Sequence, residues 1–468
     1  MVRKGSILID PFPATGHINA CITLAKFLSS RDFHICFSGL PNFKNKTRNE
    51  GFDYVVTSPF LFTPSRVEIE EKGLLKFMME NIDGSRFNKL QKKFEETASD
   101  YDRMIASLKP DLILLDDHYA QKAFFYSKYH IPIITVQTML PPLKSKGAPP
   151  FQSKHIPTKS GFSKSFTEWF WKKCLVTRSL KKLKNNIITL GQTDLNVLRA
   201  LSPDSELTIQ RERCFGVGIR ELPMISTSPK AFDFHRSTMK EEVLYFGKQK
   251  NDSEKKIEDR RLLGLLKKVQ EQKNLEQEKI LIYCSLGTLT QMREKICRKF
   301  FRKIILTAKN YTAIEFILSI GEHFDVNDLS DTPENLRIFS LVPQKQLLEH
   351  VDIMITAGGL NSIRECIDAE VPMIVYPMNK KADQPGNGAR VVFHNLGVTG
   401  NIRTASSRSV SRKIRSVLEG REQFRRSLRC MKQKIKESNR SEEKKILDLI
   451  FQLTGKRTGK LKAHYEVH

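Results

Sequence analysis

The 468-residue sequence has no pair of closely spaced cysteines. Its eight cysteines are scattered, and none forms a CxxC pair. Neither the ligand spacing of a zinc site nor a disulfide framework is therefore indicated, and we expect no bound metal. Several cysteines lie inside apolar runs, as small buried side chains do. This usage is typical of a reducing compartment, so we expect a cytoplasmic location.

Long apolar runs are also missing. No window approaches ~18 uninterrupted apolar residues, so we expect no membrane-spanning helix. The apolar run from Ser6 to Asp10 follows Arg3 and Lys4, but it is too short for a signal peptide and contains an aspartate. We predict that this run is the first buried strand.

The balance of charge is strongly basic. The formal net charge is +26 at neutral pH, which favours anionic partners: nucleic acid, an anionic membrane surface or anionic ligands. A basic but merely solvated surface is the alternative. The sequence contains no helix-turn-helix, zinc-finger or RNA-recognition pattern, and its basic residues are spread along the chain. We therefore expect no nucleic-acid partner.

The chain is too long for one compact core, so two domains are expected. Short β-branched runs alternate with helix-length segments, which is typical of parallel sheets wrapped by helices. We predict an α/β protein of two doubly wound, Rossmann-like domains facing across a cleft. The predicted segments are a first Rossmann-like domain (1–228), a linker (229–260), a second Rossmann-like domain (261–420), and a helix packing back toward the first domain, with a tail (421–468).

One segment does not fit the alternation. It begins at Phe162, ends at Lys184, and combines both tryptophans of the chain with many basic residues. The aromatic residues recur at roughly helical spacing, as in a basic amphipathic helix of the interfacial type. One reading is peripheral contact with an anionic membrane at its inner face. The other is an ordinary helix that packs its aromatic face into the domain.

A histidine follows the first predicted strand. His17 comes after a turn-rich loop and opens a predicted helix, which places its imidazole at the carboxyl edge of a parallel strand, where open α/β sheets bind ligands. There it can take a proton from a hydroxyl. A carboxylate on the far nitrogen would fix the tautomer. Asp116, at the end of another predicted strand, is the first candidate, and Asp117 is the second.

Glycine-rich turns follow two predicted strands of the second half. Small and hydroxyl residues at a strand-to-helix turn bring backbone donors to a phosphate at a helix N-terminus. An acidic residue one turn later can accept from ribose hydroxyls, and Asp383 with Gln384 suits sugar hydroxyls. The residues of the two turns and the acidic residue are Ser285, Gly287, Thr288, Gly358, Gly359, Asn361, Ser362 and Glu365.

In this order, the motifs resemble the donor signature of UDP-dependent glycosyltransferases. With Gly16-His17, they are similar to family-one enzymes of the two-domain GT-B fold, in the bacterial branch of macrolide and zeaxanthin glycosyltransferases. The similarity is strongest over residues 336–397. The residues that carry it are Leu341-Val342-Pro343-Gln344, Thr356-Ala357-Gly358-Gly359-Leu360-Asn361-Ser362, Glu365, Val371-Pro372-Met373 and Asp383-Gln384.

The resemblance implies that residues 1–228 form an acceptor-binding domain and residues 261–420 a nucleotide-sugar-binding domain. It also implies a role for each residue. His17 would be the general base and Asp116 its partner. Val342 and Gln344 would contact the nucleoside, Glu365 the ribose, the glycine-rich turns the diphosphate, and Asp383 with Gln384 the sugar. The reaction would be an inverting transfer of a hexose, glucose by resemblance, from a UDP-sugar co-substrate to a small lipophilic acceptor, without a metal or other cofactor.

Three departures from the family pattern motivate an alternative function. Ala357 replaces a histidine that donates to the diphosphate, and a lost bond of this kind costs about 1.5–3 kcal/mol. Leu341 replaces an aromatic residue that stacks on the base. The segment before Asp383 is longer than usual. The alternative is a catalytically degenerate GT-B protein that acts as a binding or regulatory partner.

Overall fold

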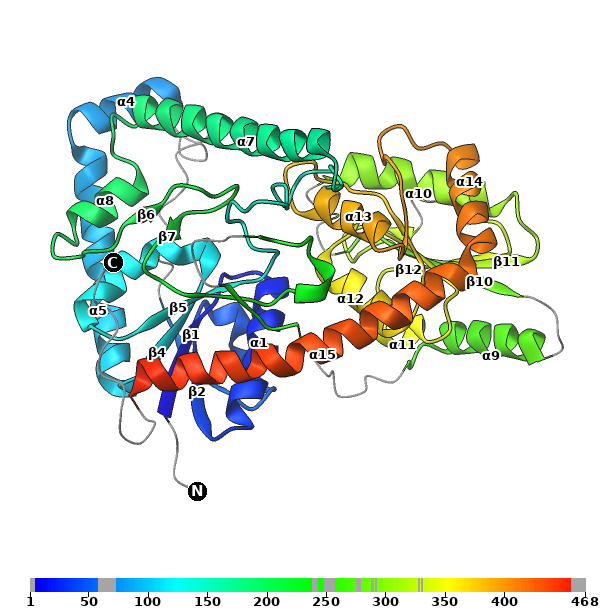
Figure 1. The fold of residues 1–468 in the computed structure, drawn as a ribbon, viewed down its shortest axis with the longest axis horizontal. Helices are drawn as coiled ribbons and strands as arrows, with labels where there is room; N and C mark the ends of the chain where they lie inside the picture. The colour runs from blue at the N-terminus through cyan, green and yellow to red at the C-terminus, as the bar shows by residue number, and fades with distance from the viewer. Residues whose placement is uncertain are drawn as a thin grey trace.

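The computed structural model describes residues 5–57, 73–237, 243–247, 257–274, 279–287, 290, 293–326, 329 and 331–455. Figure 1 shows two sheets, each flanked by helices, with a long C-terminal helix running beside both. Thr288, one of the predicted phosphate contacts, lies outside the described residues. Among the helices described, none is long and apolar enough to cross a membrane.

The first sheet has seven strands that all run parallel. In spatial order they are β3 (Asp53–Val56), β2 (Phe33–Gly39), β1 (Gly5–Asp10), β4 (Leu112–Asp116), β5 (Ile133–Gln137), β8 (Met224–Ser226) and β9 (Val243–Tyr245). Its helices are α1 (Thr15–Ser29), α2 (Lys44–Arg48), α4 (Leu74–Ile82), α5 (Ser85–Leu108), α6 (Ala123–Tyr126), α7 (Gly161–Ile188) and α8 (Asp194–Ala200). A small antiparallel pair, β6 (Ile209–Gln210) and β7 (Gly218–Ile219), lies apart from the sheet.

The second sheet has six parallel strands. In spatial order they are β12 (Leu336–Phe339), β11 (Ile314–Ser319), β10 (Ile280–Ser285), β13 (Ile353–Thr356), β14 (Met373–Val375) and β15 (Gly397–Thr399). The helices of this half are α9 (Arg260–Asn274), α10 (Glu294–Ala308), α11 (Gln344–Leu348), α12 (Leu360–Asp368), α13 (Gln384–Phe393), α14 (Ser407–Glu419) and α15 (Arg421–Thr454).

Both sheets are buried on their two faces. In β10, Leu281 and Tyr283 join one apolar cluster while Ile282 and Cys284 join the other. Successive strand residues point to opposite faces, so a strand that is apolar throughout needs helices on both sides. This explains why the central strands appear in the sequence as continuous β-branched runs.

The C-terminal helix α15 joins the two halves. Leu428 and Met431 near its start pack in the core of the second domain, whereas Ile446 and Ile450 pack in the core of the first. Part of the predicted linker, residues 229–260, belongs to the first sheet, because β9 forms its edge strand. A three-residue strand is too short to give a periodic signal in the sequence.

Candidate functional site

The carboxyl edge of the first sheet brings His17 and Asp116 together. His17 lies in the first turn of α1, and Asp116 is the last residue of β4. Nδ1 of the imidazole is 2.8 Å from Oδ2 of the carboxylate, which is 1% exposed. The same carboxylate accepts the backbone N–H of His118 at 3.0 Å.

These contacts define the state of the pair. Burial raises the pKa of Asp116, but hydrogen bonds from His118 and His17 more than offset this, so the pKa is held well below its usual value. An ionised carboxylate only accepts hydrogen bonds, so the hydrogen of His17 lies on Nδ1. Nε2 is then the basic atom of the ring, and it can receive a proton from a hydroxyl group.

Two further side chains contact this pair, and the sequence analysis missed both. The hydroxyl of Thr138 lies 3.0 Å from Nδ1 and 3.4 Å from Nε2 of His17. The ring of His118 meets that of His17 edge-on, with centroids 4.4 Å apart. Thr138 and His118 each follow a strand by one or two residues, and position after a strand is the signal that could have found them. Asp117, the second candidate partner, instead pairs with Arg213 and accepts from Gln137 at 2.8 Å.

The same cluster has the donor set of a metal site. Within the described chain, one ligand atom each from His17, Asp116 and His118 lie within 4.8 Å of one another. Two imidazoles and a carboxylate suit a transition metal. The carboxylate is already used by hydrogen bonds from both histidine residues. The carboxylate is therefore also satisfied as the partner of a base, whereas Nδ1 of His118 is buried without a hydrogen bond to any described residue.

The glycine-rich turn after β13 is shaped for close approach. Gly358 has a φ of +84°, and a Cβ there would lie 2.5 Å from Cγ1 of Val375, so a side chain is excluded on both counts. Gly359 precedes α12, whose first turn contains Asn361 and Ser362. The free N–H groups of that turn form the kind of end that binds phosphate.

Three residues predicted to bind the nucleotide sugar, Gln344, Ser362 and Glu365, form one hydrogen-bond network beside this turn. Nε2 of Gln344 donates to Oγ of Ser362 at 3.2 Å and to Oε2 of Glu365 at 2.5 Å. Its Oε1 accepts from the hydroxyl of Tyr283 at 3.2 Å. The network connects the start of α11, the first turns of α12 and strand β10. Glu365 is thereby held in place by the side-chain amide of Gln344.

Asp383 and Gln384 lie at the start of α13. Oδ2 of Asp383 accepts from Asn387 at 2.9 Å, and Asn387 also donates to the backbone oxygen of Gly358 at 3.0 Å. The Oε1 atom of Gln384 accepts the N–H groups of Met378 and Asn379 at 2.9 and 3.0 Å. Gln384 thus holds the lengthened segment before α13 through its oxygen.

The remaining predicted contacts lie at the carboxyl edge of the second sheet. Ser285 ends β10, and its hydroxyl accepts the N–H of Gly287 at 3.4 Å. Val342 is half-buried and packs on the second-domain core. Leu341 is 60% exposed, and Ala357 is buried.

The environment of Asp383 shifts the pKa of its carboxyl group. Burial raises this pKa, and the hydrogen bond from Asn387 is the main effect that opposes the rise. His118, from the first domain, opposes it more weakly.

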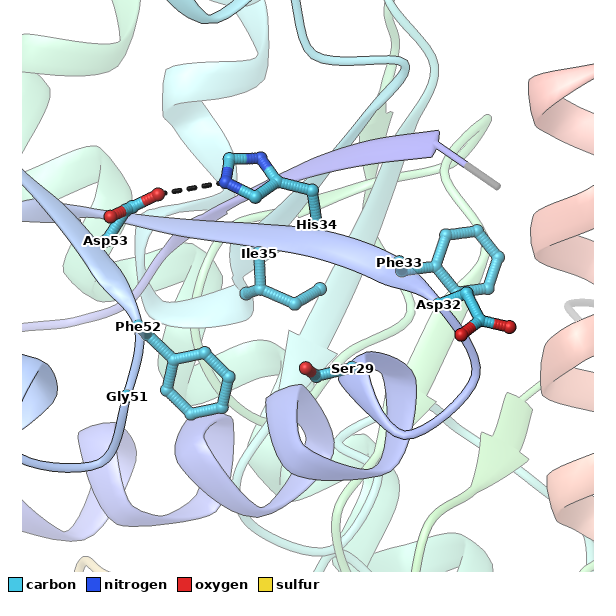
Figure 2. A pocket seen from close by; sticks show the side chains of 8 residues that line it. All are labelled: Ser29, Asp32, Phe33, His34, Ile35, Gly51, Phe52 and Asp53. Atoms are coloured by element: carbon cyan, nitrogen blue, oxygen red, sulfur yellow. Dashed lines mark hydrogen bonds and ion pairs between the residues drawn. The ribbon is translucent and has the colours of Figure 1, made fainter. Parts of the chain in front are cut away.

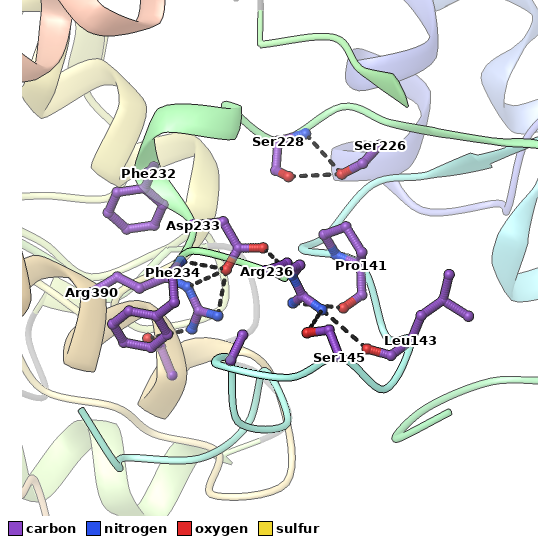
Figure 3. Close-up of polar contacts among 12 residues, drawn as sticks. Pro141, Leu143, Ser145, Ser226, Ser228, Phe232, Asp233, Phe234, Arg236 and Arg390 are labelled. Carbon is purple, nitrogen blue, oxygen red and sulfur yellow. Dashed lines mark hydrogen bonds and ion pairs between the residues drawn. The ribbon is translucent and has the colours of Figure 1, made fainter. Parts of the chain in front are cut away.

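A buried ion-pair cluster joins the domains beside α13 (Figure 3). Asp233 of the first half accepts from Nη2 of Arg390 at 2.7 Å and from Nε of Arg236 at 2.6 Å. Arg236 also donates to the backbone oxygens of Pro141 and Leu143, both at 3.0 Å. The cluster holds α13, and with it the segment that carries Asp383 and Gln384, against the first domain.

A separate recess lies away from these residues (Figure 2). Its volume is about 310 Å³, and it is lined by Ser29, Asp32, Phe33, His34, Ile35, Gly51, Phe52 and Asp53. Phe33 and His34 begin β2, so the recess is at the amino edge of the sheet. His17 and Asp116 lie at the opposite edge.

Comparisons with known proteins point to one class of enzyme. Residues 244–431 match the family described as "UDP-glucoronosyl and UDP-glucosyl transferase". NDP-glycosyltransferase YjiC of Bacillus subtilis (strain 168) is 22% identical over 447 residues, covering 94% of this chain and 96% of that protein. 4'-Demethylrebeccamycin synthase of Lentzea aerocolonigenes is 20% identical over 427 residues, covering 88% and 91%.

Solved structures share the fold. The glycotransferase of kitacinnamycin superposes with a TM-score of 0.63 at 18% identity, covering 97% of this chain and all 100% of its own. CalG4, the calicheamicin glycosyltransferase, gives a TM-score of 0.59 at 16% identity, covering 98% and 100%. The prediction of two doubly wound domains is confirmed by these likenesses and by the two parallel sheets.

Proposed function

Because this chain belongs to the family-one glycosyltransferases of GT-B fold, which transfer a sugar from a nucleotide sugar, we propose a specific reaction for it. It moves a hexose, glucose, from a UDP-sugar to a hydroxyl group of a small lipophilic acceptor, with inversion at the anomeric carbon. The observation that carries this proposal is the 2.8 Å contact between His17 and Asp116 at the carboxyl edge of β4.

In the proposed reaction, Nε2 of His17 takes the proton of the acceptor hydroxyl. Asp116 orients the ring through Nδ1 and stabilises the imidazolium that forms. The acceptor oxygen bonds to the anomeric carbon as the bond from that carbon to the diphosphate oxygen breaks, and the nucleoside diphosphate leaves with the bonding electrons. Attack from the face opposite the leaving group inverts the anomeric centre.

The donor half supplies charge stabilisation for the leaving group. The turn of Gly358 and Gly359 and the first turn of α12 direct N–H groups and the positive end of the helix toward the diphosphate. Glu365, held by Gln344, accepts from the ribose hydroxyls. Asp383, at the start of α13, accepts from the hydroxyls of the sugar.

The choice of nucleotide follows from the family and from related structures. The description of the matched family names transferases that use UDP. VinC, which superposes with a TM-score of 0.60 at 11% identity, was solved in complex with dTDP. The exposed Leu341 at the base position provides no ring for stacking. We therefore propose UDP as the preferred carrier with weak discrimination against dTDP.

Ala357 supports a second candidate, a degenerate relative that binds nucleotide without transferring sugar. It is buried and provides no side-chain donor where the resemblance implies a histidine. The two candidates differ in turnover, since only the enzyme forms a glycoside.

A thermal-shift panel of nucleoside diphosphates, followed by assay of the product anomer, tests the proposal. Ligands that bind the folded state raise its melting temperature by mass action. We expect UDP and UDP-glucose to give the largest shifts and the product to have the anomeric configuration opposite to the donor. No shift with any nucleotide, or a retained configuration, would contradict the proposal. Binding without product would favour the degenerate relative.

A further inference from the structure

Helix α7 is fixed to the first domain along one face. The indole N–H of Trp171 donates to the backbone oxygen of Ala148 at 2.8 Å, and its ring is 0% exposed. Nη2 of Arg178 donates to the backbone oxygen of Gly216 at 2.7 Å, and Thr167 is buried. The reading in which this helix packs its aromatic face into the domain therefore holds for Trp171, whereas Phe162, Phe166 and Trp169 are exposed.

The opposite face of α7 is an exposed apolar stripe. Its members are Phe162, Phe166, Trp169, Val176, Leu180, Leu183 and Ile187, all exposed. They follow one another at intervals of three, four or seven residues, so they lie in one line along the helix. The helix of 28 residues is about 42 Å long. In Figure 1, α7 runs along the upper border of the molecule.

Helix α4, which lies beside the C-terminal end of α7, also carries exposed apolar residues. Leu75, Met79 and Ile82 are exposed on it, and Gln192, just beyond the end of α7, donates to the backbone oxygen of Asn81 on α4 at 2.8 Å. Figure 1 shows α4 at the C-terminal end of α7. The apolar stripe of α7 with these three residues of α4 is called the α4/α7 face below.

The charge around this face indicates what covers it. The basic residues of α7 are Lys164, Lys172, Lys173, Arg178, Lys181, Lys182 and Lys184, and all but Arg178 are exposed. Its one acidic residue is Glu168, whose Oε2 lies 3.6 Å from Nζ of Lys144. Nζ of Lys173 lies 4.9 Å from the ring centroid of Trp169. A second copy of this chain, also of charge +26, would bring like charges together.

We propose that the α4/α7 face docks on an anionic lipid bilayer. Helix α7 lies flat in the headgroup region, its apolar stripe enters the boundary of the acyl chains, and its lysines reach the lipid phosphates. The inference takes from the proposed function only the lipophilic character of the acceptor, which a bilayer would supply. Docking requires neither donor nor turnover, so it can be tested separately.

Co-sedimentation of the full chain with vesicles tests this proposal. The vesicles are phosphatidylcholine alone or phosphatidylcholine with about one third phosphatidylglycerol. We expect binding to the anionic vesicles that weakens with added salt, and a fluorescence shift of Trp169 that brominated lipid quenches. Leu180→Glu should weaken binding by about tenfold or more. Leu306→Glu, the same change at an exposed leucine of α10, should leave binding unchanged.

Four results would overturn the proposal. They are no binding to anionic vesicles, equal binding to neutral ones, equal effects of the two substitutions, and a dimer in sedimentation equilibrium that Leu180→Glu dissociates. The last result would assign the face to a second copy of the chain. Failure of the proposed reaction would appear instead as absent nucleotide binding or turnover, with vesicle binding intact.

Discussion

Leu341 and Ala357 account for two of the three departures that the sequence analysis predicts from the family pattern. Ala357 is buried, whereas the side chain of Leu341 is 60% exposed beside the half-buried Val342. A larger side chain at position 341 therefore has room, and one at position 357 does not. The identity of the nucleotide can be tested at Leu341 without disturbing the core.

We predict that Leu341→Trp tightens binding of UDP by about tenfold. Stacking of a base on an aromatic ring contributes about 1–3 kcal/mol, and about 1.4 kcal/mol is tenfold in affinity. Isothermal titration of UDP into both proteins measures the change. Leu306→Trp, at an exposed position on α10, is the control. An affinity equal to that of the parent would show that the base does not lie over residue 341.

The sequence allowed the site residues next to strand ends to be identified. It did not identify the side chains that contact those residues. His17 and Asp116 could be paired because the carboxyl ends of parallel strands share an edge. The contacts of Thr138 and His118 with His17 depend on how the loops after β4 and β5 fold back. The pairing of Asp117 with Arg213 joins residues 96 positions apart, and no local pattern indicates it.

At the scale of elements, a strand could be predicted where its apolar run is long enough. The strands from β10 to β14 along the second sheet are continuous buried runs, apart from β12. In β12 only the first and last residues are buried, and β8, β9 and β15 have three residues each. These four strands lie at or near sheet edges, where pairing with a neighbour, and not hydrophobic periodicity, defines the strand.

The turn between β13 and α12 depends on a glycine at position 358. We predict that Gly358→Ala lowers the free energy of unfolding by about 1–3 kcal/mol, because its φ is +84° and a Cβ would meet Val375. Urea denaturation measures the loss. Gly359→Ala is the matched control, since nothing lies within 4 Å of a Cβ there. Equal effects of the two substitutions would contradict this account of the turn.

At the scale of the whole molecule, two buried contacts hold the domains in register. Arg364 donates to the backbone oxygens of Thr227 and Gly247, both at 3.0 Å, and Asp233 lies between Arg236 and Arg390. Arg364 and Arg390 are buried, and the side chain of Arg236 is 4% exposed. The position of His17 relative to the turn of Gly358 and Gly359 thus depends on buried charged side chains between the domains. The strand pattern of either sheet does not indicate these contacts.

Asp233→Asn should lower the free energy of unfolding by about 3–5 kcal/mol, because it leaves two buried guanidinium groups without their anion. Chemical denaturation followed by circular dichroism measures this change. Asp331→Asn removes an exposed carboxylate that pairs with Lys309 and should cost at most about 1 kcal/mol. Comparable losses for the two variants would show that the buried cluster does not hold the domains.

Stability should also fall in acid. Burial raises the pKa of Asp233, but the charges of Arg236 and Arg390 outweigh it, so the pKa lies below its usual value, as does that of Asp116. A carboxyl with a lowered folded-state pKa stabilises the fold above its unfolded pKa of about 3.9, and the effect is lost as pH falls through the folded value. We predict a decreasing free energy of unfolding below about pH 4, with a smaller decrease in Asp233→Asn. An unchanged free energy over that range would contradict the prediction.

The central claim is that Nε2 of His17 takes the proton of the acceptor hydroxyl. The most direct test is to compare sugar transfer and UDP binding in His17→Ala, with His34→Ala, at the opposite edge of the first sheet, as the control. We predict that His17→Ala lowers turnover by about 10²–10⁴-fold while the dissociation constant of UDP stays unchanged, and that His34→Ala alters neither. Turnover of His17→Ala close to that of the parent enzyme would contradict the account.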